Sequence, residues 1–327
     1  MKILIVKLGA IGDVLRTTSI LGGLQNKYPG AGIDWLTLPT GREMLIYNQY
    51  LNHVFLWDER NELEKYDLVI GLEDDLAAGE LAAKLGVEKV LGAFAKDGKI
   101  NYSPSAWFDM SIISKYGIEK ANRLKAKNRK TFQQHMADLL GISVGEYVYA
   151  ITPEEREYGE RIVRGVGVGG REKIVGINTG AGKRWPQKSL SIEKTIDLVN
   201  KVKNNLGLAS IILGGEEEKE RNAIIAKETG MPSSGAHTVR NFAGIINRCH
   251  AIVASDSLAM HLAIAVKRKI AAFFGPTSAA EIELYGLGVK VAPKMDCLAC
   301  YKKSCDKKPN CMDELAVEDL CKTLVYL

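Results

Sequence analysis

Residues 1–16, MKILIVKLGAIGDVLR, contain a short apolar run, a glycine-containing turn and the start of an amphipathic segment. The apolar run Ile3–Val6 has the length and composition of a buried strand, and helical periodicity begins at Val14. A buried strand followed by a turn and a helix is the first unit of an open α/β sheet. We therefore expect the turn after Val6 to lie at the carboxyl edge of a sheet, where such sheets bind their ligands.

The glycine-containing turn brings a carboxylate to that edge. Gly9 and Gly12 allow the backbone to bend sharply because neither residue has a Cβ. The residue that follows the turn is Asp13. Two interpretations of Asp13 are open: a carboxylate at this edge can take a proton from a substrate, and Asp is also a favoured cap of a following helix.

The same stretch does not match the fingerprint of dinucleotide-binding proteins. That fingerprint requires G-x-G-x-x-G after the strand, and an acidic residue close to ~20 positions further on. After Gly9 and Gly12 the next glycine is Gly22, and Asp34 starts the second apolar run rather than ending it. A dehydrogenase is therefore not expected.

The composition is that of a globular protein with a mild excess of positive charge. The chain has 327 residues, of which 46% are hydrophobic and 25% charged, and its net charge is +5. This length suits two domains, and the charge suggests an anionic substrate or surface without requiring nucleic acid. No segment approaches the ~20 apolar residues of a membrane span or resembles a signal peptide. We expect a cytoplasmic protein whose six cysteines are reduced or bound to metal.

Short apolar runs alternate with amphipathic segments in both halves of the chain. The strands expected are Ile3–Val6, Ile33–Leu38, Val54–Leu56, Leu68–Leu72, Val90–Leu91, Ile174–Ile177, Ser210–Leu213, Ile252–Ala254 and Ile270–Phe274. A charged, glycine-rich stretch between the halves predicts a linker at 156–171, with domains at 1–155 and 172–327. The fold class expected is α/β, with two Rossmann-like domains facing a central cleft, which suits an enzyme with two substrates.

Two loops of the second half have the composition of anion-binding sites. Asn178–Pro186, NTGAGKRWP, follows an apolar run, and its backbone N–H groups, Thr179 and Lys183 suit a phosphate, although an ordinary loop is the alternative. Ser255–His261, SDSLAMH, precedes a helix whose N-terminus favours an anion. His261 is either part of that site or a buried structural residue.

Acidic residues follow two of the expected strands. Glu216–Glu218 comes after the apolar run IILGG, where an acid can accept hydrogen bonds from ribose hydroxyls. Favourable charge at a helix N-terminus is the other explanation for these acids. Glu73–Asp75 ends a strand of the first domain, and we interpret it as a rim or acceptor-side feature of a site.

Two further segments have an unusual composition, one rich in cations and one rich in cysteines. Residues 115–130 contain seven Lys or Arg and one acid, which indicates either a solvated helix face or a surface for a phosphorylated partner. Four cysteines lie within fifteen residues at Cys297, Cys300, Cys305 and Cys311. Their spacing is typical of a structural zinc site; an iron–sulfur cluster, free thiols and a disulfide are the alternatives.

Four motifs in this order resemble the bacterial lipopolysaccharide heptosyltransferases, glycosyltransferases of the GT-B fold that use ADP-heptose. KLGAIGDVLRTTSIL is similar to the family's start, and NTGAGKRWP to its phosphate-binding loop. The third motif, SDSLAMHLA followed by FFGPT, resembles its Asp-[ST]-Gly-x-x-His-Leu-Ala and Phe-Gly-Pro-Thr signatures, and the fourth, CLACYKKSC, its cysteine-rich tail. The resemblance covers nearly the whole chain. Leu258 stands where the family usually has glycine, and because leucine tolerates positive φ poorly, we expect this loop to approach the diphosphate differently.

The resemblance implies an inverting transfer of heptose to the inner core of lipopolysaccharide, at Kdo-lipid A or its heptosylated form. It implies that Asp13 is the general base and that Lys183 stabilises the leaving group, with no cofactor required for catalysis. The donor-binding residues expected are Asn178, Thr179, Gly180, Lys183, Glu216, Glu218, Asp256, Ser257, Leu258 and His261. The acceptor-binding residues expected are Gly12, Lys115, Arg123 and Lys125.

The expected partners are an ADP-sugar, an anionic lipopolysaccharide core and the inner face of the cytoplasmic membrane, with the protein peripheral there and no nucleic acid bound. The same fold with another sugar donor or acceptor is one alternative. A metal-stabilised nucleic-acid-binding protein is another, but the net charge is modest and Tyr301 is the only aromatic residue of the cysteine tail. A binding protein without activity is the third, and the presence of Asp13 and Lys183 argues against it.

Overall fold

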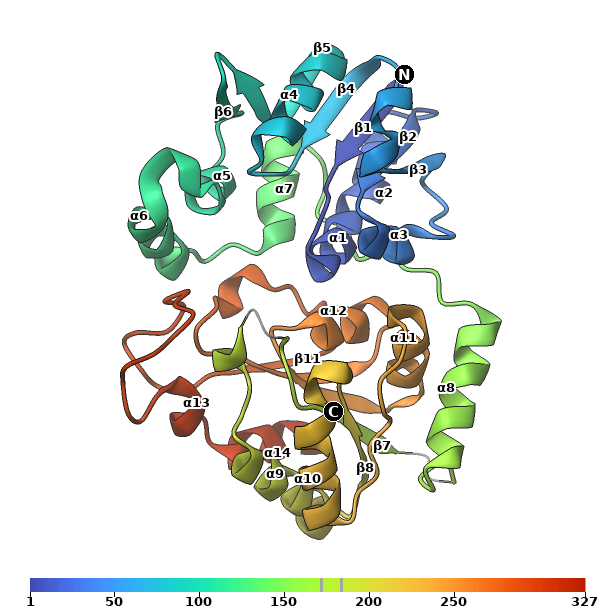
Figure 1. The fold of residues 1–327 in the computed structure, drawn as a ribbon, viewed down its shortest axis with the longest axis vertical. Helices are drawn as coiled ribbons and strands as arrows, with labels where there is room; N and C mark the ends of the chain where they lie inside the picture. The colour runs from blue at the N-terminus through green and yellow to red at the C-terminus, as the bar shows by residue number, and fades with distance from the viewer. Residues whose placement is uncertain (171–172, 183–184, 327) are drawn as a thin grey trace. The chain divides into compact units, whose positions relative to one another are not determined.

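The computed structural model describes residues 1–170, 173–182 and 185–326, with the backbone alone at residues 113 and 114. It divides into two compact units (Figure 1). Unit 1 consists of Met1–Ala150 with Ala280–Glu283, and unit 2 of Ile151–Ala279 with Leu284–Leu327. Among the described residues, no helix combines the length and the apolar composition that crossing a membrane requires.

Unit 1 is built on a sheet in which the first strand of the chain lies near the centre. The strand order is β3-β2-β1-β4-β5-β6, and only β6 runs antiparallel to its neighbour. The strands are β1 (Lys2–Val6), β2 (Gly32–Thr37), β3 (His53–Leu56), β4 (Tyr66–Gly71), β5 (Gly86–Lys96) and β6 (Lys99–Tyr102). All of β1 except Lys2 is buried, as the apolar run predicts.

The helices of unit 1 follow the strands and cover the sheet. They are α1 (Ile11–Thr17), α2 (Leu21–Lys27), α3 (Pro39–Leu45), α4 (Leu76–Leu85), α5 (Ala106–Ser111), α6 (Ile113–Lys127) and α7 (Phe132–Leu140), with 3₁₀ turns η1 (Thr18–Ile20) and η2 (Trp57–Glu62). Leu4 and Val6 of β1 pack in one apolar cluster with Ala82 and Leu85 of α4. This packing holds β1 against α4 and keeps the end of the strand in place.

Unit 2 contains a sheet of parallel strands with helices on both sides (Figure 1). The order is β11-β10-β9-β7-β8, formed by β7 (Ile174–Asn178), β8 (Ala209–Leu213), β9 (Ala251–Ser255), β10 (Lys269–Phe273) and β11 (Gly288–Val291). The helices are α8 (Pro153–Gly165), α9 (Ile192–Leu206), α10 (Lys219–Thr229), α11 (Val239–Arg248), α12 (Leu258–Ala265), α13 (Cys311–Glu314) and α14 (Val317–Val325). Short 3₁₀ turns are η3 (Pro186–Lys188), η4 (Glu216–Glu218) and η5 (Ala279–Glu281).

Each sheet contains one position where the strand order reverses. In unit 1 the chain places β2 on one side of β1 and β4 on the other. In unit 2 it places β8 on one side of β7 and β9 on the other. Open α/β sheets bind ligands outside the carboxyl ends of the strands at such a reversal. The loops after β1, β4, β7 and β9 are therefore the candidates for a site.

The α/β fold class is confirmed, and each expected strand is present with ends that differ by a few residues. The sequence analysis missed β6 and β11, which are edge strands with largely exposed or half-buried residues. The linker expected at 156–171 differs from the structure, because its first part belongs to α8 and the units divide between Ala150 and Ile151. The charged composition of this segment belongs to the solvated side of a helix rather than to a linker.

The helix α8 starts at a strong cap and packs closely on α11. Thr152 accepts a hydrogen bond from the backbone of Glu155, and the Glu155 carboxylate accepts one from the backbone of Thr152. A Cβ at Gly159 would lie 2.1 Å from the carbonyl oxygen of Gly244, and one at Gly244 would lie 2.0 Å from that of Glu155. The two helices can approach this closely only because both positions are glycine.

We expect Gly159→Ala to destabilise the protein by about 2 kcal/mol or more, because the added methyl group forces two backbones apart. The control is Gly165→Ala at the end of the same helix, where a Cβ meets nothing within 4 Å. This control should be neutral or slightly stabilising. Urea unfolding of both variants measures the difference, and equal stabilities would show that the α8–α11 contact is not as close as described.

Candidate active site

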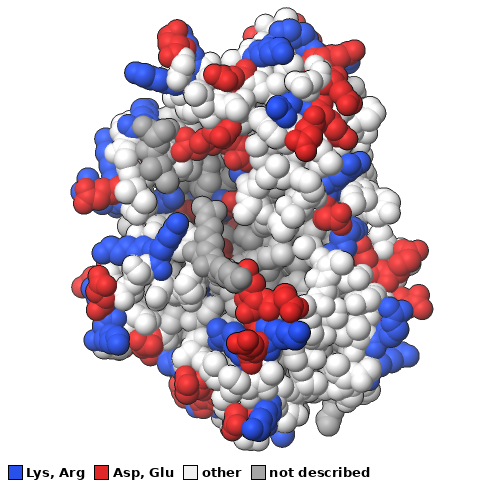
Figure 2. Space-filling model, in the orientation of Figure 1, with Lys and Arg blue, Asp and Glu red and all other residues white. Residues whose placement is uncertain are grey.

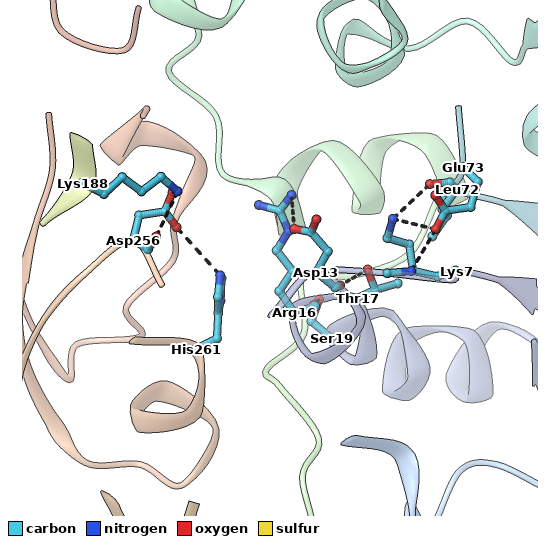
Figure 3. A network of polar contacts seen from close by, with 11 residues as sticks. Lys7, Asp13, Arg16, Thr17, Ser19, Leu72, Glu73, Lys188, Asp256 and His261 are labelled. Atoms are coloured by element: carbon cyan, nitrogen blue, oxygen red, sulfur yellow. Dashed lines mark hydrogen bonds and ion pairs between the residues drawn. The ribbon is translucent and has the colours of Figure 1, made fainter. Parts of the chain in front are cut away.

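The loop after β1 is held in place by a carboxylate from the end of β4. Glu73 Oε1 accepts hydrogen bonds from the backbone N–H of Leu8 at 2.6 Å and of Gly9 at 3.4 Å. The same oxygen lies 2.8 Å from Lys7 Nζ, in an ion pair that is mostly buried (Figure 3). Glu73 therefore organises the loop, and its place at the rim or on the acceptor side of a site stays a prediction.

Asp13 is the third residue of α1, close to the carboxyl end of β1. The N-cap of α1 is Ala10, which has no side chain that can cap the helix, so Asp13 does not occupy the capping position. The Asp13 side chain is 38% exposed, and its Oδ1 lies 2.9 Å from the guanidinium of Arg16 (Figure 3). The structure thus leaves a half-exposed carboxylate beside a cation at the point where the strand order of unit 1 reverses.

The two glycines of this stretch have a smaller conformational role than expected. Neither Gly9 nor Gly12 has a positive φ, and Gly12 lies inside α1 rather than in a turn. A Cβ at Gly9 would meet nothing within 4 Å. The expected acceptor contact of Gly12 stays a prediction, and the position of Asp13 depends on α1 and on Glu73 instead.

In unit 2, the loop after β7 is fastened to the neighbouring loops by its own side chains. Asn178 Nδ2 donates to the carbonyl oxygen of Gly180 at 2.6 Å and to Ser257 Oγ at 3.5 Å. Thr179 is buried, and its hydroxyl donates to Asn222 Oδ1 at 2.5 Å. Because that hydroxyl hydrogen is used inside the protein, Thr179 supports the loop rather than offering a donor to phosphate, which corrects the expected role.

Two acidic residues after β8 differ in role: Glu218 supports the neighbouring loop, and Glu216 is exposed. Glu218 Oε2 accepts a hydrogen bond from the Gly215 backbone at 2.9 Å, and its side chain fills the space where a Cβ of Gly180 would lie. Glu216 is 74% exposed and lies 3.4 Å from Lys219. Of the two residues expected to bind ribose, Glu216 is accessible, and Glu218 braces the loop after β7.

The loop after β9 contains a carboxylate that is almost enclosed and paired with a buried lysine. Asp256 Oδ2 lies 2.8 Å from Lys188 Nζ, which also donates to the Asp256 carbonyl oxygen at 3.0 Å (Figure 3). His261 Nε2 lies 3.9 Å from Asp256 Oδ1, and His261 is buried in α12. Burial opposes ionisation of Asp256, but Lys188 and His261 outweigh it and lower its pKa from 3.8 to about 2.

The helix α12 begins directly after this carboxylate. Ser257 is its N-cap, with no side-chain hydrogen bond to the first turn, and Leu258 is its first residue. Leu258 has no positive φ, so leucine is accommodated at this position, and a different approach of the loop to the diphosphate stays a prediction. The backbone N–H groups at this helix start and the Ser257 hydroxyl are suited to an anion.

Several expected site residues lie elsewhere or are not described. Lys183 falls outside the described residues. Arg123 is exposed on α6, Lys125 is half-buried there, and Lys115 lies 3.4 Å from Asp109. Lys115 also lines a cavity of about 560 Å³ together with Lys99 and other residues of unit 1. In Figure 2, blue side chains occur along the edge of the molecule where α6 lies in Figure 1.

The four cysteines of the tail are free thiols. Burial, and after it the neighbouring thiols of Cys300, Cys305 and Cys297, raises the pKa of Cys311 to about 11. Within the described ranges, no group of three or more His, Cys, Asp and Glu side chains is arranged to hold a metal ion. The structural zinc or iron–sulfur cluster expected at Cys297, Cys300, Cys305 and Cys311 stays a prediction.

The cysteine tail has a visible structural role beside the loop after β10. The backbone N–H of Ala299 donates to the Gly275 carbonyl oxygen at 2.9 Å, and that of Tyr301 to Pro276 at 2.8 Å. The Tyr301 ring meets Trp185 edge-on at 6.5 Å between centroids. The tail thus joins the Phe-Gly-Pro-Thr turn to the end of the loop after β7.

The sequence analysis missed Arg16 and Lys188, and it missed the hydrogen bonds that Glu73 makes. Arg16 stands three residues after Asp13, a spacing at which side chains of a helix meet, so its ion pair was readable from the sequence. Lys188 and Asp256 are 68 positions apart, and nothing local to either residue indicates the pair. Glu73 was noticed, but its bonds to the loop after β1 depend on the pairing of β1 with β4.

Comparisons with known proteins agree with one another. A family model described as glycosyltransferase family 9 (heptosyltransferase) matches residues 60–311. Lipopolysaccharide heptosyltransferase 1 of Pseudomonas aeruginosa is 23% identical over 341 aligned positions, which cover 94% of this chain and 88% of that protein.

Solved structures with the same fold span the chain. A glycosyl transferase family 9 protein from Veillonella parvula superposes with a TM-score of 0.76 at 18% identity, covering 99% of this chain and 96% of its own. ADP-heptose lps heptosyltransferase II of E. coli gives a TM-score of 0.67 at 17% identity, with 100% and 98% covered. E. coli heptosyltransferase WaaC with ADP-2-deoxy-2-fluoro heptose gives 0.64 at 17% identity, with 100% and 99% covered. At these identities the likeness concerns the fold.

We expect Lys188→Met to destabilise the protein by about 3–5 kcal/mol, because it leaves the Asp256 carboxylate enclosed without its cation. The double variant Lys188→Met/Asp256→Asn should recover most of that loss. The control is Lys322→Met, whose exposed pair with Asp319 at 3.6 Å should contribute less than about 1 kcal/mol. Equal losses in Lys188→Met and Lys322→Met in urea unfolding would contradict the role of Lys188.

The same pair predicts an acid-dependent stability. The folded pKa of Asp256, about 2, lies below its ordinary value of 3.8, so ionised Asp256 stabilises the folded form above pH ~4. This contribution, roughly 2 kcal/mol, is lost as the pH falls toward 2. Urea unfolding between pH 5 and pH 2 should show this loss in the wild type and a smaller one in Asp256→Asn. Parallel curves for the two proteins would exclude it.

Proposed function

The chain belongs to glycosyltransferase family 9, the heptosyltransferases, and on this premise we propose that it transfers heptose from ADP-heptose to the inner core of lipopolysaccharide, at Kdo-lipid A or its heptosylated form. It is a glycosyltransferase. The proposed reaction is inverting and uses no cofactor for catalysis. The observation that supports it most directly is the half-exposed Asp13 carboxylate at the strand reversal of unit 1.

Asp13 is the general base of the proposed reaction. It accepts the proton of an acceptor hydroxyl while that oxygen forms a bond to the anomeric carbon of the heptose. The bond between the anomeric carbon and the diphosphate oxygen breaks, and ADP leaves with the electron pair. Because the hydroxyl attacks opposite to the leaving group, the anomeric configuration inverts.

Unit 2 supplies the groups that bind the donor and stabilise the leaving diphosphate. The start of α12 presents backbone N–H groups and the Ser257 hydroxyl, and Asn178 Nδ2 lies 3.5 Å from that hydroxyl. These groups favour negative charge where it develops. Lys183 adds a cation to the loop after β7, and Glu216 accepts hydrogen bonds from the ribose. Asp256 and His261 hold the loop after β9 in place.

The acceptor binds to unit 1 through cations of α6. Residues 115–130 contain seven Lys or Arg against Glu119, and the acceptor is rich in phosphate and carboxylate. Lys115 at the cavity of unit 1, with Arg123 and Lys125 beyond the break that α6 has at Gly117, recognises those anions. The same charge holds the protein at the inner face of the cytoplasmic membrane, where the lipid acceptor is presented.

We expect Asp13→Asn to reduce heptose transfer at least about 100-fold while ADP binding changes little, because the amide cannot accept the proton. Transfer from ADP-heptose to Kdo-lipid A and to its heptosylated form measures activity, and calorimetry with ADP measures binding. The better of the two acceptors identifies which heptose is added.

The matched control for this variant is Asp319→Asn. Asp319 lies in the first turn of α14 and pairs with a cation three residues later, as Asp13 does in α1. This control should keep wild-type transfer. Full activity in Asp13→Asn, or no transfer by the wild type to either acceptor, would refute the proposed reaction.

Charge reversal on α6 tests the acceptor surface. The triple variant Lys120→Glu/Arg123→Glu/Lys127→Glu should raise the KM for the acceptor about tenfold or more and leave ADP binding unchanged, because it opposes only the anionic acceptor. The control Lys2→Glu/Lys84→Glu/Lys89→Glu changes the net charge of unit 1 equally at exposed positions outside α6 and the cavity. The same acceptor KM in both triple variants would rule out a specific role of α6.

A further inference from the structure

The guanidinium of Arg16 lies against two aromatic rings that come from distant parts of the chain. Its central carbon is 4.4 Å from the ring centroid of Phe132 in α7 and 5.2 Å from that of Trp107 in α5. The two rings meet each other edge-on, with centroids 4.9 Å apart. The Arg16 side chain is only 12% exposed. A cation in such a place gains from the electrons of both rings.

Each ring is fixed by the start of its own helix. Phe132 is the first residue of α7, behind the capping box that Thr131 forms with Gln134. Trp107 donates its backbone N–H to Ser105 Oγ at 3.2 Å, and its ring packs against His135 at 5.8 Å. The aromatic pair is therefore a rigid support, and Arg16 has little freedom to change rotamer.

Arg16 faces Asp13 from this support. One guanidinium nitrogen lies 2.9 Å from Asp13 Oδ1. The backbone carbonyl oxygens of both residues also accept side-chain hydrogen bonds, from Thr17 at 2.7 Å to Asp13 and from Ser19 at 2.8 Å to Arg16 (Figure 3). The Asp13 carboxylate thus projects from a helical turn whose backbone carbonyls are hydrogen-bonded by side chains. One of its oxygens is paired with the guanidinium of Arg16.

We propose that Arg16, held between Phe132 and Trp107, is the positioning residue that orients the Asp13 carboxylate for proton abstraction. This inference rests on the proposed function, in which Asp13 is the base. A carboxylate on a free side chain rotates among several positions, and a misplacement of about 1 Å can lower a rate ~100-fold. A planar guanidinium can stack on the rings and bond the carboxylate at the same time, which a lysine ammonium cannot.

The first test is Arg16→Ala, with kcat and KM measured separately. We expect kcat to fall about 30- to 100-fold, with the KM for ADP-heptose changed less than about twofold, because the base is displaced while unit 2 still binds the donor. Added methylguanidinium should restore kcat at least about fivefold by entering the space between the rings. Methylammonium, with the same charge but without the planar group, should not restore it.

Arg16→Ala leaves a cavity beside the rings, so a second variant retains a long side chain at this position. Arg16→Lys keeps the charge and most of the length, and we expect it to lose about tenfold in kcat with its thermal unfolding midpoint near that of the wild type. The control is Arg60→Ala, which removes another arginine that lies on an aromatic ring of unit 1, 4.9 Å from Trp57. That control should keep the wild-type kcat and show no response to methylguanidinium.

The outcomes separate this inference from the reaction on which it rests. If Asp13→Asn is inactive but Arg16→Ala keeps the wild-type kcat, the positioning role is wrong and the base is unaffected. A folded Arg16→Ala protein whose kcat falls but does not respond to methylguanidinium also overturns it, because loss of packing alone explains that result. Full activity of Asp13→Asn instead removes the proposed function itself.

Discussion

This structure depends on one constraint, which is the pairing of β1 and of β7 with a strand on each side. β1 and β7 are the first strands of their sheets in the sequence, and each has hydrogen bonds to two neighbours. β1 pairs with β2 on one side and with β4 on the other, and β7 pairs likewise with β8 and β9. The loops that leave these strands therefore separate, and backbone N–H groups and side chains gather at the carboxyl edges. Asp13 in unit 1 and Asp256 in unit 2 both stand at such an edge.

Carboxylates at these edges are stable there because each has a cation beside it. Glu73 pairs with Lys7, Asp13 with Arg16 and Asp256 with Lys188, at 2.8, 2.9 and 2.8 Å. An enclosed carboxylate without a cation would take up a proton or destabilise the fold. The most exposed of the three is Asp13, at 38% against 18% for the other two. Glu73 and Asp256 hold loops, which leaves Asp13 as the carboxylate best placed to meet a substrate.

Local patterns in the sequence predict most of the sheet and the Asp13 turn, because a buried parallel strand must be an apolar run. β6 and β11 were missed because exposed edge strands carry charged residues and lack that signal. The glycines near the end of α8 favour a linker, but Thr152 and Glu155 form a capping box that marks a helix start.

The contacts that complete the site are long-range and could not be read in this way. The pairing of Arg16 with Asp13 follows from helix spacing, but the rings of Trp107 and Phe132 reach Arg16 only through the packing of α5 and α7. Lys188 meets Asp256 only because β7 and β9 are neighbours in the sheet.

The measurement that tests the central claim most directly is the fate of the donor during a single reaction with Kdo-lipid A. ADP release and the anomeric configuration of the transferred heptose can be followed together, by coupled assay and by NMR of the product. Inverting transfer predicts one ADP released for each heptose transferred, and a product anomer opposite to that of the donor. Retention of configuration, or ADP release without a glycosylated acceptor, would contradict it.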